Sequence, residues 1–482
     1  MSAENGATRD GNARWSWSSA TFWLVIVGLL LRLYHYGRNP SIWHDEAATV
    51  MNVLTKSFTG LLGPLDVSAT GPTLFLWSQK CVSLIMGDST YALRLVSFLA
   101  SCAGLILFAR FVQRQLAPMP AACATLLVAC SDRLLWHASE ARHYSSDFLL
   151  AAVLLALLAF TREWSPTRRA ILFTLLTPIV IFGSYPGVFL CGGVFIALLP
   201  EVRKEGRAAA WGATGLFGAT IVTAFVFFYL VTIRVQRSAA MDAAWVHTFP
   251  DWDRAWTVPL WAVTSTVSVV DYLCRPIGGV LIVPAFIGAL RLWRSGRRDF
   301  VLFATVPMLL AMLAALPKCY PYTGARTMVF AMPALVLLIG AGLEQILEQA
   351  RTTRSLARAT LAILLIPLAA TLGFSVYRVI APWPRADTSG ASAYVLARRQ
   401  PDEPVTANHW EYNYYFRGLG SSFYSDLGLL EDTKRPGRFW LVLTSGDPRD
   451  REAILDSVDG WQTIDRREFE NSTVFLLSRK EP

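Results

Sequence analysis

Two adjacent carboxylates are the side chains of this sequence best suited to chemistry. Asp45 and Glu46 follow Trp43 and His44, a few residues after the first long apolar run of the chain. Ionisable groups beside a bilayer are costly unless they face water, a partner or a substrate. A carboxylate in that position can act as a general base and remove a proton from an acceptor hydroxyl. We therefore predict a functional site around Asp45.

Polar residues recur at two later boundaries of apolar runs, one at Glu140 to Tyr144 and one at Tyr322 to Arg326. An Arg can bind a phosphate through paired hydrogen bonds, so cations near Asp45 would suit transfer of a group from a lipid phosphate. The alternative is that Glu140 pairs with Arg142 or another cation only to hold loops together. The candidate substrate-binding residues are Arg326, Arg142, Glu140, Tyr144, Asp66 and Tyr322.

The composition predicts an α-helical polytopic membrane protein. Hydrophobic residues make up 54% of the 482 residues and charged residues only 16%, against about one quarter charged in soluble proteins. About eleven apolar runs approach the length of a membrane-spanning helix. Their cores are Phe22–Leu33, Tyr91–Val112, Met119–Leu135, Phe148–Phe160, Ala170–Phe182, Val188–Leu199, Trp211–Ile233, Ile277–Trp293, Phe300–Leu316, Thr327–Ile346 and Ala359–Val379. The shorter runs Thr73–Met86 and Val258–Val270 predict interfacial helices.

The positive charges predict an orientation in the membrane. Lys and Arg gather in alternate loops, as they do in cytoplasmic loops of membrane proteins. This pattern predicts a multi-pass protein of the inner (plasma) membrane, with a cytoplasmic tail over residues 1–20 and a transmembrane domain over residues 21–381. The large first loop, residues 36–72, and the C-terminal residues 382–482 would then face the exterior. The net charge of +9 is explained by this orientation rather than by nucleic-acid binding.

The cysteines and histidines give no spacing typical of a metal site. None of the seven cysteines is paired in a zinc or thiol-redox motif, although Cys274 and Cys319 both fall in predicted exterior loops and a disulfide between them is an alternative. His44, His137 and His143 lie near acidic residues, which leaves a divalent ion as a second alternative. We expect no required metal and no other cofactor.

The composition becomes soluble-like after Pro382 and Pro384, which predicts a small exterior α/β domain. Its aromatic stretch from Trp410 to Phe416 fits a hydrophobic core better than a carbohydrate-binding surface. The predicted helices are Ser389–Arg399, Tyr412–Arg417 and Arg449–Val458, and the predicted strands are Val405–Asn408, Phe439–Thr444, Gln462–Arg467 and Thr473–Leu477.

The membrane region resembles the GT-C superfamily of polytopic glycosyltransferases. The resemblance is to the bacterial branch related to dolichyl-phosphate-mannose protein mannosyltransferases and to the lipid A aminoarabinose transferase. It rests on an ordered set of motifs, which are Trp43-His44-Asp45-Glu46, Gly71-Pro72-Thr73-Leu74-Phe75, Tyr91-Ala92-Leu93-Arg94-Leu95, Glu140-Ala141-Arg142-His143-Tyr144, and Gly324-Ala325-Arg326 followed by Pro333.

The resemblance implies an inverting enzyme that takes a sugar from a polyprenyl-phosphate donor and passes it to a lipid, glycan or protein acceptor on the exterior face. Asp45 would be the general base, and Glu46 would support it or help to bind acceptor or metal. Many relatives carry His-Pro-Pro where this chain has Thr70-Gly71-Pro72, so that histidine is absent here. The alternative is a lipid-linked sugar flippase or transporter, a class that usually shows internal repeats, and none is visible in this sequence.

Overall fold

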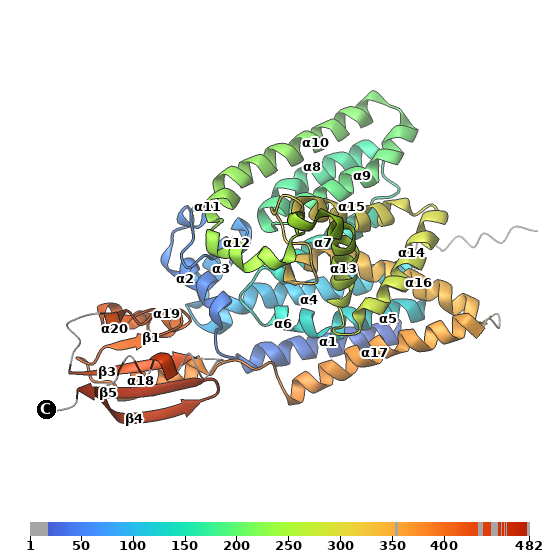
Figure 1. Ribbon diagram of the computed structural model, residues 1–482. Helices are drawn as coiled ribbons and strands as arrows, with labels where there is room; N and C mark the ends of the chain where they lie inside the picture. Colours follow the sequence, from blue (N-terminus) through green and yellow to red (C-terminus); the bar gives the residue numbers. More distant parts are fainter. Residues whose placement is uncertain are drawn as a thin grey trace, which may run out of the picture.

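The computed structural model describes residues 18–351, 355–431, 437–444, 452–454, 456, 458 and 460–479. Helices form one large body, and a small domain built on a β-sheet lies at one end of it (Figure 1). The last long helix of the body leads directly into this domain. The predicted fold class, a helical membrane protein with a C-terminal α/β domain, is confirmed.

Seven helical segments in the described residues are long and apolar enough to cross a membrane. They are α1 (Ser19–Arg38), α4 (Thr90–Gln115), α8 (Pro166–Gly183), Ala208–Gln236, α15 (Arg298–Ala315), Arg326–Arg351 and Arg358–Ile380. Ala208–Gln236 comprises α10 (Ala208–Phe228), the π-helical η2 (Tyr229–Ile233) and α11 (Arg234–Gln236), Arg326–Arg351 comprises η6 (Arg326–Ala331) and α16 (Met332–Arg351), and Arg358–Ile380 belongs to α17 (Ser355–Ile380).

The other predicted spans coincide with shorter or more charged helices. These are α5 (Pro118–Cys130), α7 (Tyr144–Phe160), α9 (Gly187–Glu205) and α14 (Ile282–Arg294), which follows η5 (Gly278–Leu281). The predicted interfacial helices are present as α3 (Thr73–Met86) and α13 (Val258–Asp271), and neither is among the seven long segments. Short helices fill the remaining loops: α2 (His44–Thr55), η1 (Gly60–Leu62), α12 (Ala239–Trp245), η3 (Val246–Thr248) and η4 (Trp252–Thr257).

The prediction of one continuous span over Met119–Leu135 is wrong. The chain breaks at Ser131, whose side chain accepts the Leu134 N–H and caps a separate helix, α6 (Asp132–Ala138). The break leaves the last carbonyls of α5 without helical partners. Arg32 of α1 donates to two of them, Val128 O at 3.1 Å and Ala129 O at 3.0 Å. A buried cation thus joins α1 to the end of α5.

The C-terminal domain contains a five-stranded sheet with the order β2-β1-β3-β5-β4. Its strands are β1 (Val405–Ala407), β2 (Phe423–Tyr424), β3 (Arg438–Thr444), β4 (Trp461–Phe469) and β5 (Ser472–Arg479), and its helices include α18 (Thr388–Arg398), α19 (Tyr412–Tyr415) and α20 (Gly428–Glu431). β1 pairs in parallel with β2 and β3, whereas β5 pairs antiparallel with β3 and β4. The sequence did not predict β2, η7 (Arg417–Ser422) or α20, and most of the predicted helix Arg449–Val458 lies outside the described residues.

The aromatic stretch of this domain serves two purposes. Tyr412 and Phe416 are fully buried in the domain core, as expected. Tyr414 and Tyr415 instead pack against the loop between α1 and α4, where the Tyr415 hydroxyl accepts the Ile42 N–H at 2.8 Å. The C-terminal domain therefore holds the segment that leads into α2.

We expect Tyr415→Phe to loosen this contact. The Ile42 side chain is 1% exposed, and the variant leaves its backbone N–H without the acceptor it has in the structure. Loss of one partner of a buried hydrogen bond costs about 1–3 kcal/mol in unfolding free energy. Thermal unfolding in detergent measures the change, with Tyr377→Phe as control because Tyr377 is exposed. Equal stability of the two variants would contradict the assignment.

Candidate active site

Asp45 lies in the first turn of α2 and is ion-paired with Arg326 at the start of the segment Arg326–Arg351. The pair joins residues far apart in the sequence. The side chain of Asp45 is 22% exposed and that of Arg326 is 27% exposed, so both remain within reach of a ligand. His44 Nε2 lies 3.7 Å from the other carboxylate oxygen. The predicted base and one predicted phosphate ligand are thus in direct contact.

Arg142 is buried behind this pair and fixes the backbone of α2. Its Nη1 donates to Asp45 O at 3.2 Å and to the Thr49 hydroxyl at 2.5 Å. Its Nη2 donates to the Tyr144 hydroxyl at 3.3 Å, and its Nε is buried with no hydrogen-bond partner among the described residues. Arg142 therefore acts on the Asp45 carboxylate through its charge rather than through a direct hydrogen bond.

The surrounding cations keep Asp45 ionised. Burial by itself would raise the pKa of the Asp45 carboxyl, but the charges of Arg142 and Arg326, with a smaller contribution from His44, lower it below its ordinary value. A carboxylate in this state can accept a proton at neutral pH. The ion pair with Arg326 engages its Oδ2, whereas its Oδ1 lies 3.7 Å from His44 Nε2.

Glu46 is fully buried and has four hydrogen bonds. Arg94 donates to its two oxygens from Nε and Nη2, both at 2.8 Å, Arg385 Nη1 donates at 2.8 Å, and the Ala141 N–H donates at 2.7 Å. Burial would raise the pKa of this carboxyl, but Arg94 and Arg385 outweigh burial and lower it. Glu46 joins α2, α4, the loop after α6 and the start of the C-terminal domain, so it positions its neighbour Asp45.

Glu140 is hydrogen-bonded to a histidine and a tryptophan of its own segment. His137 Nδ1 lies 2.6 Å from one Glu140 oxygen, and Trp136 Nε1 donates to the other at 2.9 Å. His137 Nε2 in turn lies 2.9 Å from the Tyr272 hydroxyl. This series of hydrogen-bonded side chains forms a polar wall beside the Asp45–Arg326 ion pair. It also gives Glu140 a partner other than Arg142.

Aromatic rings surround the Arg326 guanidinium. Its central carbon lies 5.7 Å from the ring centres of Trp43 and Tyr144 and 5.8 Å from that of Trp245. A planar guanidinium over such rings gains cation–π attraction while its N–H groups stay available. The rings thus fix the position of the Arg326 guanidinium, and the ion pair with Asp45 leaves some of its N–H groups available to a ligand.

Two predicted site residues lie apart from this cluster. The Asp66 carboxylate is 69% exposed and pairs with Lys56 Nζ at 3.1 Å, while the Tyr322 hydroxyl lies 2.9 Å from the Thr266 hydroxyl. Arg94 belongs to the quoted motif Tyr91–Leu95 but was not predicted as a site residue, and neither were Arg385 and Trp245. A cation inside an apolar run is a signal that would have identified Arg94, whereas nothing in the sequence places Arg385 beside Glu46.

The described residues contain no group of three or more His, Cys, Asp or Glu side chains placed to hold a metal ion. Cys274 is buried and Cys319 exposed, and both are free thiols, so the alternative disulfide is not formed.

Solved structures with the same architecture identify the fold. ArnT from Cupriavidus metallidurans bound to undecaprenyl phosphate is similar to this chain with a TM-score of 0.55 and 15% identity, over 95% of this chain and 98% of that chain. The apo form of the same protein is similar with a TM-score of 0.53 and 14% identity, again over 95% of this chain and 98% of that chain. The Archaeoglobus fulgidus oligosaccharyltransferase in complex with Zn and sulfate is similar with a TM-score of 0.50 and 10% identity, over 83% of this chain and 62% of that one. The chain has the GT-C fold.

The similarity is one of structure rather than sequence. No protein-family model matches the chain, and no curated protein is similar to it in sequence. The motifs that indicated a GT-C fold nevertheless meet in space, because Asp45, Glu46, Arg94, Arg142 and Arg326 all belong to the contacts described above. In this chain, the first large loop and the start of the segment Arg326–Arg351 build one polar centre.

Proposed function

We propose that this protein is an inverting membrane glycosyltransferase that moves a sugar from a polyprenyl-phosphate donor to the hydroxyl of a lipid, glycan or protein acceptor. The observation that carries the proposal is the partly exposed contact between an ionised Asp45 and the Arg326 guanidinium. The undecaprenyl phosphate bound to the structurally similar ArnT supports a polyprenyl-phosphate donor.

The reaction follows from the two partners of this ion pair. Asp45 removes the proton of the acceptor hydroxyl, and the acceptor oxygen attacks the anomeric carbon from the face opposite the phosphate. The bond from that carbon to the phosphate oxygen breaks, and the polyprenyl phosphate leaves with the electron pair. Arg326 stabilises the negative charge of the leaving phosphate, and the buried charge of Arg142 assists it.

Donor binding also prepares the base. A phosphate that binds Arg326 competes with Asp45 for the same guanidinium, because Arg326 Nη1 contacts the carboxylate in the structure. The exchange frees the Asp45 oxygen that Arg326 holds, so donor binding makes both carboxylate oxygens available to the acceptor hydroxyl. Glu46 takes no part in proton transfer and holds α2 in place through Arg94 and Arg385.

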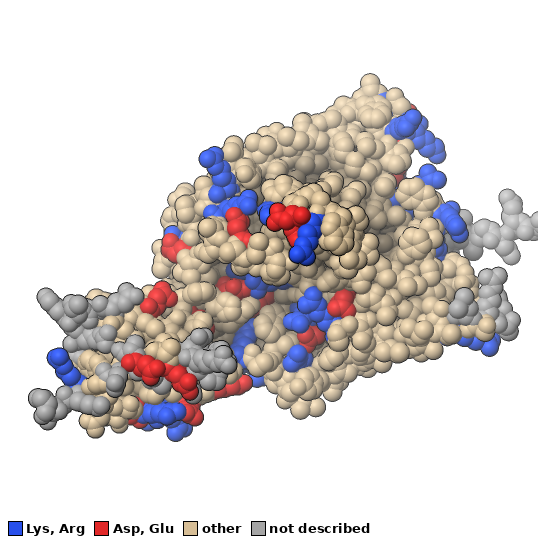
Figure 2. Space-filling view, viewed as in Figure 1, with Lys and Arg blue, Asp and Glu red and all other residues tan. Residues whose placement is uncertain are grey.

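The site would face the exterior of the inner membrane. In the predicted orientation, residues 1–20 are cytoplasmic, residues 21–381 are the transmembrane domain and residues 382–482 form an exterior domain. Figure 2 supports this orientation, since Lys and Arg side chains gather at the end of the helical body remote from the C-terminal domain. The mechanism requires no metal or other cofactor, and it uses the side chains described above.

A transfer assay tests the proposed function. Purified protein in lipid vesicles is incubated with a panel of radiolabelled polyprenyl-phosphate sugars and membrane-derived acceptors, and label in the acceptor is measured for the wild type and Asp45→Asn. We expect transfer from one donor by the wild type only. Movement of labelled donor across the bilayer without transfer would instead identify a flippase.

We expect Arg326→Gln to weaken donor binding and to alter the pH profile. The variant removes a phosphate ligand, so KM for the donor should rise by about 10-fold to 100-fold, as for loss of a hydrogen bond to a charged group. It also removes a cation that lowers the pKa of Asp45. The acidic limb of kcat/KM should therefore move to higher pH, because the base becomes protonated sooner as the pH falls.

Arg234→Gln is the matched control, because Arg234 is exposed on α11. An Arg326→Gln enzyme with unchanged donor KM and an unchanged acidic limb would exclude Arg326 as the phosphate ligand.

A further inference from the structure

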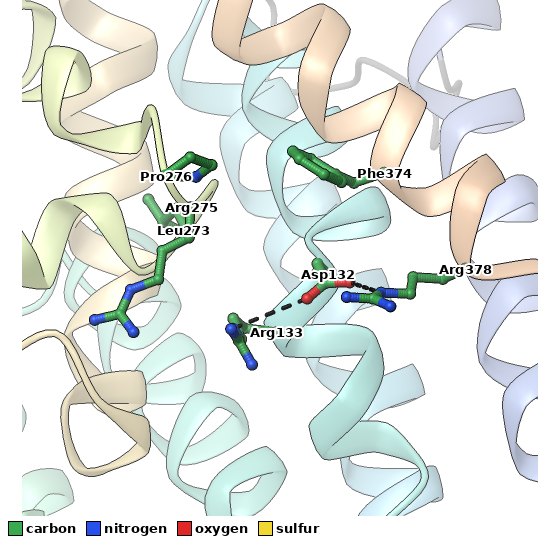
Figure 3. A pocket seen from close by; sticks show the side chains of 7 residues that line it. All are labelled: Asp132, Arg133, Leu273, Arg275, Pro276, Phe374 and Arg378. Carbon is green, nitrogen blue, oxygen red and sulfur yellow. Dashed lines mark hydrogen bonds and ion pairs between the residues drawn. The ribbon is translucent and has the colours of Figure 1, made fainter. Parts of the chain in front are cut away.

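A second cationic site lies on the other side of the wall formed by Tyr272. A pocket of about 250 Å³ is lined by Asp132, Arg133, Leu273, Arg275, Pro276, Phe374 and Arg378 (Figure 3). Its basic residues come from three separate elements: α6, the segment after α13, and the last turn of α17. The pocket is smaller than the roughly 300–1,000 Å³ typical of drug-sized sites, so it suits a head group rather than a large ligand.

The charges of the pocket are only partly compensated. Asp132 is the single acidic residue in its lining, and one of its oxygens accepts from Arg378 Nε at 2.7 Å and from Trp383 Nε1 at 3.0 Å. Its other oxygen lies 3.9 Å from Arg133 Nε, beyond hydrogen-bonding distance. Two of the three guanidinium groups therefore share Asp132, and the third, that of Arg275, pairs with Asp271 outside the lining.

Arg133 has the weakest ion pair of this set, with its Nε 3.9 Å from the Asp132 carboxylate. Within the described part of the chain its side chain donates no hydrogen bond, and its Nε is buried without a partner. Arg275 Nη2 donates a hydrogen bond to Gly324 O, and Arg275 Nε lies 3.5 Å from the Asp271 carboxylate. In the view of Figure 3 the Arg133 group lies between those of Arg275 and Arg378. The lining thus presents three guanidinium groups from separate elements to an anion that enters the pocket.

The surroundings indicate that the anion belongs to a lipid. Phe374, Leu273 and Pro276 give the pocket an apolar wall. Arg378 belongs to the last turn of α17, and the neighbouring α17 side chains Val376 and Ile380 are 53% and 79% exposed, as expected for a helix face in contact with lipid. A lipid bound here can keep its chains along α17 and its phosphate at the arginines.

We propose that this pocket binds the phosphate group of a membrane lipid, separately from the phosphate bound at Arg326. The two sites share Tyr272 as a wall: its hydroxyl contacts His137 on one side, while Arg133 and Arg275 lie 5.9 Å and 5.4 Å from its ring centre. Occupancy of the pocket does not depend on sugar transfer.

Native mass spectrometry of the full chain in detergent tests the proposal, with dioleoylphosphatidic acid, dioleoylglycerol and inorganic phosphate as separate probes. We expect the wild type to bind phosphatidic acid in preference to dioleoylglycerol, and Arg133→Gln to weaken that binding about tenfold, the usual loss for one charge-assisted hydrogen bond. Arg254→Gln is the control, since Arg254 is exposed on η4 and does not belong to the pocket lining. Both variants leave Asp45 and Arg326 unchanged.

Three results would overturn the proposal. The first is equal binding of phosphatidic acid by Arg133→Gln and Arg254→Gln. The second is equal binding of phosphatidic acid and dioleoylglycerol, which would assign the contact to the acyl chains. The third is Arg133-dependent binding of inorganic phosphate as tight as that of phosphatidic acid, which would assign the pocket to free phosphate. Because all three are binding results, they are independent of the transfer assay.

Discussion

Asp45→Asn should lower the rate of sugar transfer by about 10²-fold to 10⁴-fold, the usual contribution of general base catalysis. The amide keeps the size of the carboxylate and its place on α2, but it cannot accept the proton of an acceptor hydroxyl. The Arg142 hydrogen bond to this residue uses the backbone oxygen of Asp45 and is unaffected by the change. We therefore expect loss of kcat in a protein that still folds and still binds donor.

The matched control for this experiment is Asp242→Asn. Asp242 is also paired with an arginine, Arg237, whose Nε lies 2.9 Å from it, but both side chains are roughly half exposed. Its replacement should leave transfer near the wild-type rate. Single-turnover measurement with bound labelled donor separates chemistry from donor binding. A well-folded Asp45→Asn enzyme with normal turnover would exclude Asp45 as the base.

Glu46→Gln should chiefly reduce stability, by about 3–5 kcal/mol, because it removes one partner of a buried ion pair. The change leaves the guanidinium groups of Arg94 and Arg385, whose side chains are 1% and 7% exposed, without a negative charge. We expect a low yield and an early thermal transition in detergent. Neutralising one cation as well, in Glu46→Gln with Arg385→Gln, should restore part of the stability because the uncompensated charge falls.

Glu468→Gln is the control for burial. Glu468 also pairs with an arginine, but its side chain is 63% exposed and that of Arg466 is 52% exposed. Exposed ion pairs contribute about 0–1 kcal/mol, so its loss should change stability little. A Glu46→Gln protein that is as stable as the Glu468→Gln protein but inactive would give Glu46 a direct part in the reaction.

The two adjacent carboxylates show what a sequence motif can and cannot predict. The sequence placed Asp45 and Glu46 together at a membrane boundary but could not assign a separate role to each. In α2 successive side chains point in different directions. Asp45 consequently meets Arg326 at the partly open side, whereas Glu46 is buried between α4 and the C-terminal domain.

The sequence by itself determined the class of the protein and most of the helices, and it singled out Asp45, Arg142 and Arg326, which lie together in the structure. Apolar runs and their charged ends are local properties of the sequence, and they are sufficient to predict a membrane-spanning helix. It also indicated the GT-C fold through motifs whose members do meet. It failed where a span is broken, because the Ser131 cap depends on how α5, α6 and α1 pack.

Only the tertiary structure decided which of the predicted residues lie together. Asp66 and Tyr322 have residue types suited to binding, yet Asp66 pairs with Lys56 and Tyr322 with Thr266. Arg385, more than three hundred residues after Glu46, reaches it because the C-terminal domain docks on the first loop. Partners so distant in the chain leave no local pattern, since their contact is set by packing and by the need to neutralise a buried charge.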